Sequence, residues 1–182
     1  MANAKVLTGQ QATKPGLYTW TSISPGIACG VTSIPCATAL PPQQFGPIGS
    51  TWTITILAAC TVKTTPLDFG TVGLLSANID AQGTIQPQCS LSTPYSVGLN
   101  PGTNSNAGLR YTKSVASTGK VNYSIFRDLA RSLVWSDIGS SNVFSGTGTG
   151  FGVNVTAYGR IPAQVTPSAA TYNDTVVVTV SC

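Results

Sequence analysis

The sequence contains no histidine and no glutamate, and its five acidic residues are all aspartates. Charged residues make up 8% of the chain, whereas about 25% is usual in a soluble domain. Without imidazole, a Ser-His-Asp triad, a Cys-His pair and a histidine metal site are excluded, and no Glu can act as a base. Few catalytic designs remain, so the composition predicts a protein that is not an enzyme and that needs no cofactor and no metal.

Long apolar runs and a dense positive patch are also absent. The longest apolar stretches, such as Ile56–Cys60, are far shorter than the ~20 residues of a membrane span. Five of the nine cationic residues lie between Arg110 and Arg131, but they are spread along that segment. This spacing favours a solvated face over a nucleic-acid site, and we expect no nucleic-acid partner.

Five cysteines in a chain so poor in charge indicate an oxidising compartment. None of their spacings is typical of a zinc site, so two disulfides with one cysteine left over are the simplest account. Cys29 and Cys36 are seven residues apart and could close a small loop. The remaining cysteine could be free or could pair with another chain.

Residues 1–49 differ in composition from the rest of the chain. A proline occurs about every ten residues, and the segment contains no acidic residue. Short stretches could form strands, but none has the length of a core strand. We therefore predict a loop-rich N-terminal extension rather than a separate domain.

The pattern changes at Ser50, where polar and apolar residues begin to alternate. Trp52, Ile54, Ile56 and Ala58 fall on one side of an extended chain, and threonines fall on the other. This period of two predicts a strand with one buried face.

Further short strands with turn signals between them predict an all-β sandwich. We expect these strands at 61–63, 84–89, 95–99, 121–126, 152–158 and 174–181. The valine run in the last strand predicts burial on both faces. The one helix candidate is 127–135.

Several segments, in the same order along the chain, resemble the Spore Coat Protein U domain family, which includes the archaic (Csu-type) chaperone–usher pilins. They are CTV (60–62), PLDFGTV (66–72), GTI (83–85), QC (88–89), VNYSIFRD (121–128), VWSD (134–137), YGRIPAQ (158–164) and YNDTVVVTV (172–180). The resemblance covers about residues 51–182.

The resemblance implies an immunoglobulin-like sandwich that lacks its last strand. In such pilins a donor strand from the next subunit fills the open groove by β-strand addition. The donor of the family lies just before the first cysteine of the domain, which corresponds here to residues 50–59, followed by a pilin domain over 60–182. Trp52, Ile54, Ile56 and Ala58 would then enter the groove. The alternative is that 50–59 is simply the first strand of the domain's own sheet.

The family also implies the disulfide and the partners. Cys60 and Cys89 match its disulfide positions, and Cys182 departs from it because such chains usually end in an aromatic residue. The implied function is a structural subunit of an extracellular bacterial pilus. Its partners would be identical subunits, with a periplasmic chaperone and an outer-membrane usher during assembly.

Two other functions stay open. An adhesive tip domain would bind through exposed apolar residues, with Trp20, Phe45 and Ile48 as candidates, and a secreted monomeric coat protein would not assemble at all. Asp128 and Asp137 could suggest a catalytic pair or a calcium site, but pairing with Arg127, Arg131 or Arg160 is the expectation, since calcium needs a denser set of ligands.

Overall fold

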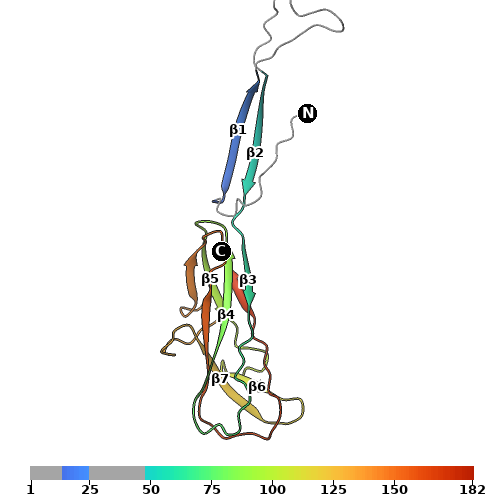
Figure 1. The fold of residues 1–182 in the computed structure, drawn as a ribbon, viewed down its shortest axis with the longest axis vertical. Coiled ribbons are helices and arrows are strands. Elements are labelled where there is room, and N and C mark those ends of the chain that lie inside the picture. The colour runs from blue at the N-terminus through green and yellow to red at the C-terminus, as the bar shows by residue number, and fades with distance from the viewer. Residues whose placement is uncertain (1–13, 25–47) are drawn as a thin grey trace, which may run out of the picture. The chain divides into compact units, whose positions relative to one another are not determined.

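The structure, a computed structural model, describes residues 14–24 and 48–182. These residues form strands, turns and loops, with no helix among them. They divide into two compact units, one holding the strands Gly16–Ser24 and Ile48–Ile56 and the other holding Leu57–Cys182 (Figure 1). The expectation of an all-β protein is therefore confirmed.

The first unit is a two-stranded antiparallel hairpin made of β1 (Gly16–Ser24) and β2 (Ile48–Ile56). The register pairs Trp20 with Trp52 and Tyr18 with Ile54, and all nine residues of each strand have a partner. Directly opposite residues of an antiparallel pair share a face. Trp52 and Ile54 of β2 therefore lie on the same face as positions 20 and 18 of β1. The threonines of both strands lie on the other face.

The second unit contains two antiparallel sheets. A five-stranded sheet has the order β3-β4-β9-β7-β6, and a three-stranded sheet has the order β10-β5-β8. Their bounds are β3 (Cys60–Thr64), β4 (Ile79–Cys89), β5 (Pro94–Leu99), β6 (Arg110–Lys113), β7 (Lys120–Phe126), β8 (Phe144–Thr147), β9 (Val155–Ile161) and β10 (Val178–Ser181).

The core lies between these two sheets, as the alternating burial of β4, β7 and β9 requires. Every second residue of these strands is buried, and residues of β5 face them from the other sheet. The fully buried Trp135 donates its indole N–H to the carbonyl oxygen of Val97, at 2.9 Å. The unit is therefore a β-sandwich with a single apolar interior.

Three local predictions are wrong. The segment 1–49 was expected to hold no strand as long as a core strand, yet β1 has nine residues because it pairs with β2 along its whole length. Residues 127–135 form a bend instead of a helix because the Asp128 carboxylate accepts the backbone N–H groups of Ser132 and Leu133, and Arg131 has a φ of 56°. The valine run is not buried on both faces: Val177 is 51% exposed and Val178 is half-buried, because the strand lies at the edge of its sheet.

Candidate functional site: an open cleft between the two sheets

The sandwich contains a cavity of about 1310 Å³ between its sheets. Its walls come from the inner faces of β4, β7 and β9 on one side and from β5 and the segment leading into β10 on the other. Its lining includes apolar side chains such as Phe69, Ile85, Val121, Ile125 and Val176, and also polar ones such as Thr112 and Asp174. The space is open to solvent and has a mixed lining, so it is a cleft rather than a closed void in the core.

Two edge strands reach the cleft at one end each, because Thr64 at the end of β3 and Val178 at the start of β10 are among its lining residues. β3 ends the five-stranded sheet and β10 ends the three-stranded sheet, so each has one edge without a strand partner among the described residues. The Cα atoms of β3 and β10 approach within 8 Å, yet the two strands do not pair. Val62, Val178 and Val180 occupy the inward positions of these strands, but all three are only half-buried. Both sheets therefore leave apolar side chains and backbone groups uncovered at this border.

The segment between β3 and β4 contributes part of the wall through Leu67 and Phe69. Both side chains cross β9 at Gly159, where an added Cβ would lie 2.6 Å from Leu67 Cδ2 and 2.9 Å from Phe69 Cζ. Phe69 also meets the ring of Tyr123 edge-on, with centroids 6.2 Å apart. Sequence reasoning did not single out these two residues, although they alternate within the family motif PLDFG.

Asp174 fixes the segment that leads into β10. Its carboxylate accepts hydrogen bonds from the Tyr123 hydroxyl at 2.7 Å, from the Thr103 hydroxyl at 2.9 Å, and from the backbone and side-chain amides of Asn104, both at 3.0 Å. Burial and the hydrogen bond to Asp174 raise the pKa of Tyr123, so its hydroxyl stays a donor at any physiological pH. The network holds one wall of the cleft against β7.

Arg110 is a buried cation of the sandwich, at 6% exposure. Its guanidinium donates to the carbonyl oxygens of Leu99, Asn100 and Trp135 at 2.9–3.3 Å. Burial lowers the pKa of Arg110. The acceptors of these hydrogen bonds are all backbone carbonyl oxygens. The Arg110 side chain therefore connects β6 to the end of β5 and has a structural role.

Asp80 forms the ion pairs of the described residues. Arg160 donates two hydrogen bonds to it, at 2.7 and 2.8 Å, and Arg131 Nη1 lies 3.3 Å from its Oδ2. The hydrogen bonds from Arg160 and the charge of Arg131 hold the pKa of Asp80 below its usual range.

The expected pairing of Asp128 and Asp137 with arginines is therefore wrong. Asp128 accepts from Ser132 and Leu133, and Asp137 accepts from the N–H of Ile138, because both carboxylates close local turns. Within residues 14–24 and 48–182, no group of three potential metal ligands occurs.

Cys60 and Cys89 form a disulfide, as the family resemblance implied. They are register partners at the ends of β3 and β4, so the bond fixes the edge strand β3 to its neighbour. Cys182 is exposed and is not in a disulfide with another described cysteine. Cys29 and Cys36 lie outside the described residues.

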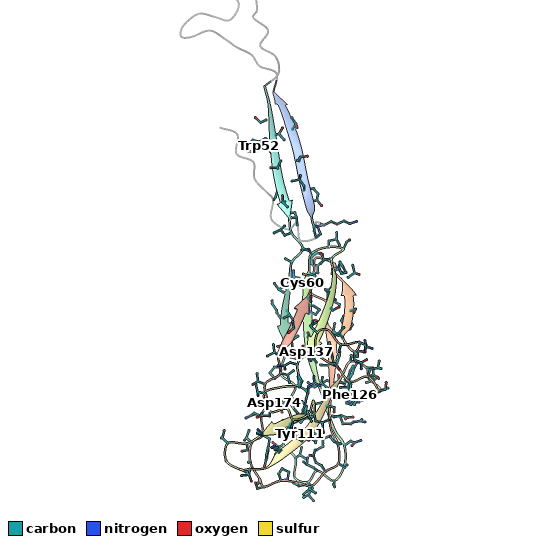
Figure 2. All side chains as sticks on the ribbon, turned by 180° about the vertical axis from the view of Figure 1, so that it is seen from behind. Trp52, Cys60, Tyr111, Phe126, Asp137 and Asp174 are labelled. Carbon is teal, nitrogen blue, oxygen red and sulfur yellow. A yellow bond between two sulfur atoms is a disulfide. The ribbon has the colours of Figure 1, made fainter. Side chains whose placement is uncertain are left out.

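The predicted donor residues Trp52, Ile54 and Ile56 lie in β2 and are half-buried there. Figure 2 labels Trp52 on this strand. None of the three belongs to the core cluster of the sandwich. Ala58 follows the end of β2 and is exposed.

The residues predicted for adhesion are less fully described. The backbones of Trp20 and Ile48 lie in β1 and β2, and Phe45 falls outside the described residues. Trp52, Ile54 and Ile56 thus lie in the hairpin unit, whereas Ala58 and the cleft lie in the unit that holds the sandwich.

Comparison with known proteins assigns this chain to a family. The model of the Spore Coat Protein U domain matches residues 49–179. "Protein U" of Myxococcus xanthus is 30% identical over 127 residues, which are 63% of this chain and 70% of that protein.

Among solved structures, a chain of the CsuC–CsuE chaperone–tip adhesion subunit pre-assembly complex from archaic chaperone–usher Csu pili of Acinetobacter baumannii has the same fold. Its TM-score is 0.61 at 22% identity, and the match covers 97% of this chain but only 62% of that one. No helix of the described residues has the length and apolarity of a membrane span. From the extent of the domain match and the identity to Protein U, the chain belongs to the Spore Coat Protein U domain family.

Proposed function

We propose that this protein is a structural subunit of an extracellular bacterial pilus, assembled by donor-strand exchange through a chaperone–usher pathway. The observation that carries the proposal is the open cleft of about 1310 Å³, whose lining combines apolar side chains of both sheets with residues at the ends of the edge strands β3 and β10. An extended chain added to the free edge of β10 would satisfy its backbone groups, and alternate side chains would fill the cleft.

Residues 50–59 of a second copy are the proposed occupant, with residues 60–182 as the acceptor domain and 1–49 as the extension. Trp52, Ile54 and Ile56 alternate with threonines, as an inserted strand with one inward face requires. Burying three such side chains contributes about 5–8 kcal/mol before the loss of conformational entropy is subtracted. Ala58 would face the same side but would contribute little.

An unfilled cleft would favour aggregation, so we propose that a periplasmic chaperone protects each subunit until an outer-membrane usher adds it to the fibre. The solved structure of similar fold is a complex between a chaperone and a pilus subunit, which supports this pathway. The disulfide agrees with passage through the oxidising periplasm to the cell surface.

The test compares Ile54→Asp with Thr53→Asp in the full chain. Ile54 is half-buried and faces the apolar side of its strand, whereas Thr53 is exposed on the opposite side. We expect Ile54→Asp to abolish fibre formation, since a carboxylate cannot enter the apolar cleft, and Thr53→Asp to retain it. Circular dichroism of both variants verifies that the sandwich is folded, and fibres formed by Ile54→Asp would contradict the proposal.

A second candidate function is adhesion, and the hairpin is the feature that favours it. Leu17 is 68% exposed and Tyr18 is 38% exposed on adjacent positions of β1. The backbones of Trp20 and Ile48 lie in the same hairpin, but the register pairs Trp20 with Trp52 and Ile48 with Ser24, so these two candidates are not partners. A subunit that acts in this way at a pilus tip would not form long homopolymers.

A further inference from the structure

The proposed donor residues lie in a strand that is already paired with another strand of the same chain. β1 pairs with β2 along its whole length, so the backbone of the donor strand has a partner in the free subunit. We propose that β1 is an intramolecular blocking strand, which keeps β2 from entering a cleft until a neighbouring subunit displaces it. This inference rests on the proposed donor-strand function and adds a regulatory step to it.

The space at the cleft border supports displacement of β1. Strands in a sheet lie about 4.8 Å apart, so a single inserted strand separates its two neighbours by about 10 Å and an inserted hairpin by about 14 Å. The Cα atoms of β3 and β10 approach within 8 Å. Entry of one strand requires a modest opening, whereas entry of the whole hairpin would drive the two edge strands apart. β2 must therefore leave β1 to be inserted.

The pairing geometry provides a starting point for this exchange. Among the described residues β2 pairs with β1 alone, so one edge of β2 stays open. That edge can meet the free edge of β10 in another copy while β1 is still in place. As further hydrogen bonds form with the acceptor, β1 is released residue by residue, and no step leaves the entire donor strand unpaired.

The composition of the donor strand explains why blocking is useful. Residues 51–56 contain no charged residue, no proline and no glycine, and three of the six are large and apolar. Such a hexapeptide, with an exposed edge and an apolar face, has the features of an aggregation-prone segment. Pairing with β1 covers one edge of it and half-buries Trp52, Ile54 and Ile56.

A reversible lock tests the proposal directly. Thr19 and Thr53 are register partners, and both are exposed. Opposite residues of an antiparallel pair are close enough for a disulfide, as Cys60 and Cys89 demonstrate in this chain. The variant Thr19→Cys with Thr53→Cys, in a Cys182→Ser background, fixes β1 to β2 when it is oxidised. Thr19→Ser with Thr53→Ser in the same background is the matched control.

Fibre formation by the full chain is followed by light scattering in both oxidised and reduced samples. We expect the oxidised lock to lower the rate of assembly at least about tenfold and mild reduction to restore it, with no such change in the serine control. The control measures any effect of the reductant on the native disulfide. Assembly of the oxidised lock at the rate of the control would overturn the proposal.

A second pair of variants avoids engineered disulfides. Thr21 and Thr51 are also register partners, and both are exposed. Thr21→Lys with Thr51→Lys places like charges opposite each other and weakens the hairpin, whereas Thr21→Lys with Thr51→Glu strengthens it. We expect the Lys–Lys variant to assemble roughly threefold faster than the Lys–Glu variant, in line with cross-strand pair energies. Equal rates, or the reverse order, would contradict a blocking role.

A peptide with the sequence of residues 50–59 separates this proposal from the donor-strand function. The peptide carries no β1, and it is added to the full chain with Ile54→Asp, whose own donor strand is disabled. A rise in the melting temperature of the sandwich shows that the cleft accepts the donor sequence. If the peptide binds but the lock has no effect, only the blocking role fails. If the peptide does not bind, the donor-strand function itself fails.

Discussion

Asp174 is the residue on which the shape of the cleft wall depends most. It accepts four hydrogen bonds from three residues in two other segments of the chain, and it joins the approach to β10 to the loop after β5 and to β7. A carboxylate with so many donors cannot be removed without leaving partly buried polar groups unpaired.

We therefore expect Asp174→Ala to lower the free energy of unfolding by about 3 kcal/mol, measured by urea denaturation. Asp68→Ala is a suitable control because Asp68 is exposed and accepts a local bond from the N–H of Gly70, so its loss should cost less than about 1 kcal/mol. Similar losses in the two variants would show that the Asp174 network does not have the stabilising role given to it here.

Asp80 provides a pH dependence with a definite sign. Its pKa is depressed in the folded chain by the hydrogen bonds from Arg160 and by the charge of Arg131. The stabilisation is thus present above the unfolded pKa of about 3.9 and is lost as the pH falls through the lower folded value. Since the side chain is 37% exposed, its contribution is below about 1 kcal/mol.

Comparison of the wild-type chain with Asp80→Asn measures this contribution. The difference in unfolding free energy between them should be largest near pH 7 and should shrink as the pH falls through the lowered folded pKa of Asp80, because protonation makes that side chain neutral, as asparagine is. A difference that does not change with pH would mean that the ion pair has no such effect.

At the scale of single residues, sequence reasoning found the alternating Trp52, Ile54 and Ile56 because a period of two is visible in the sequence. It did not find Leu67 and Phe69 as cleft residues, since their position depends on close approach to Gly159, which is about 90 residues away. The predicted arginine partners of Asp128 and Asp137 were wrong for a different reason. Backbone N–H groups close in sequence bind these carboxylates in place of the arginines.

At the scale of strands, β3 is the part of the cleft border that is fixed covalently. The bond between Cys60 and Cys89 closes a loop with a sequence separation of 29 and joins β3 to β4 at the end of their pairing. In the chain-entropy model such a loop stabilises the fold by about 3–4 kcal/mol.

Replacing both cysteines by serine should therefore lower the free energy of unfolding by about 3–4 kcal/mol. It should also increase hydrogen exchange in β3 more than in β7, since β3 is an edge strand with one partner and β7 pairs on both sides. Cys182→Ser is the control, because Cys182 is exposed and forms no disulfide with a described cysteine. An equal increase in hydrogen exchange in β3 and β7 would contradict the conclusion that the disulfide mainly stabilises the edge strand.

Strands with strong polar–apolar alternation were predictable. Their central residues were assigned correctly even where the strand ends differed. The prediction of 84–89 fell inside β4, 121–126 fell inside β7, and 95–99 fell inside β5. β6 and β8 were missed because each has only four residues, and their pairing is determined by neighbours distant in sequence. The pairing of β2 with β1 was missed for a different reason, since sequence alone gave no partner for a strand expected to serve another subunit.

For the protein as a whole, the sandwich buries a core but leaves the edges of β3 and β10 without strand partners among the described residues. Gels of unheated samples separate the functions that these edges allow. A fibre subunit should give a ladder of bands that collapses on boiling, because inserted strands dissociate only when the acceptor unfolds. A tip adhesin or a monomeric coat protein should give a single band with or without heating.

The most direct measurement is a cryo-EM map of the assembled fibre that resolves Trp52. We predict that this side chain, with Ile54 and Ile56, lies in the cleft of the adjacent subunit, next to the free edge of β10, and that β1 of the same chain is no longer paired with β2. A map in which the β1–β2 hairpin is intact and the cleft is closed by residues of its own chain would contradict the account.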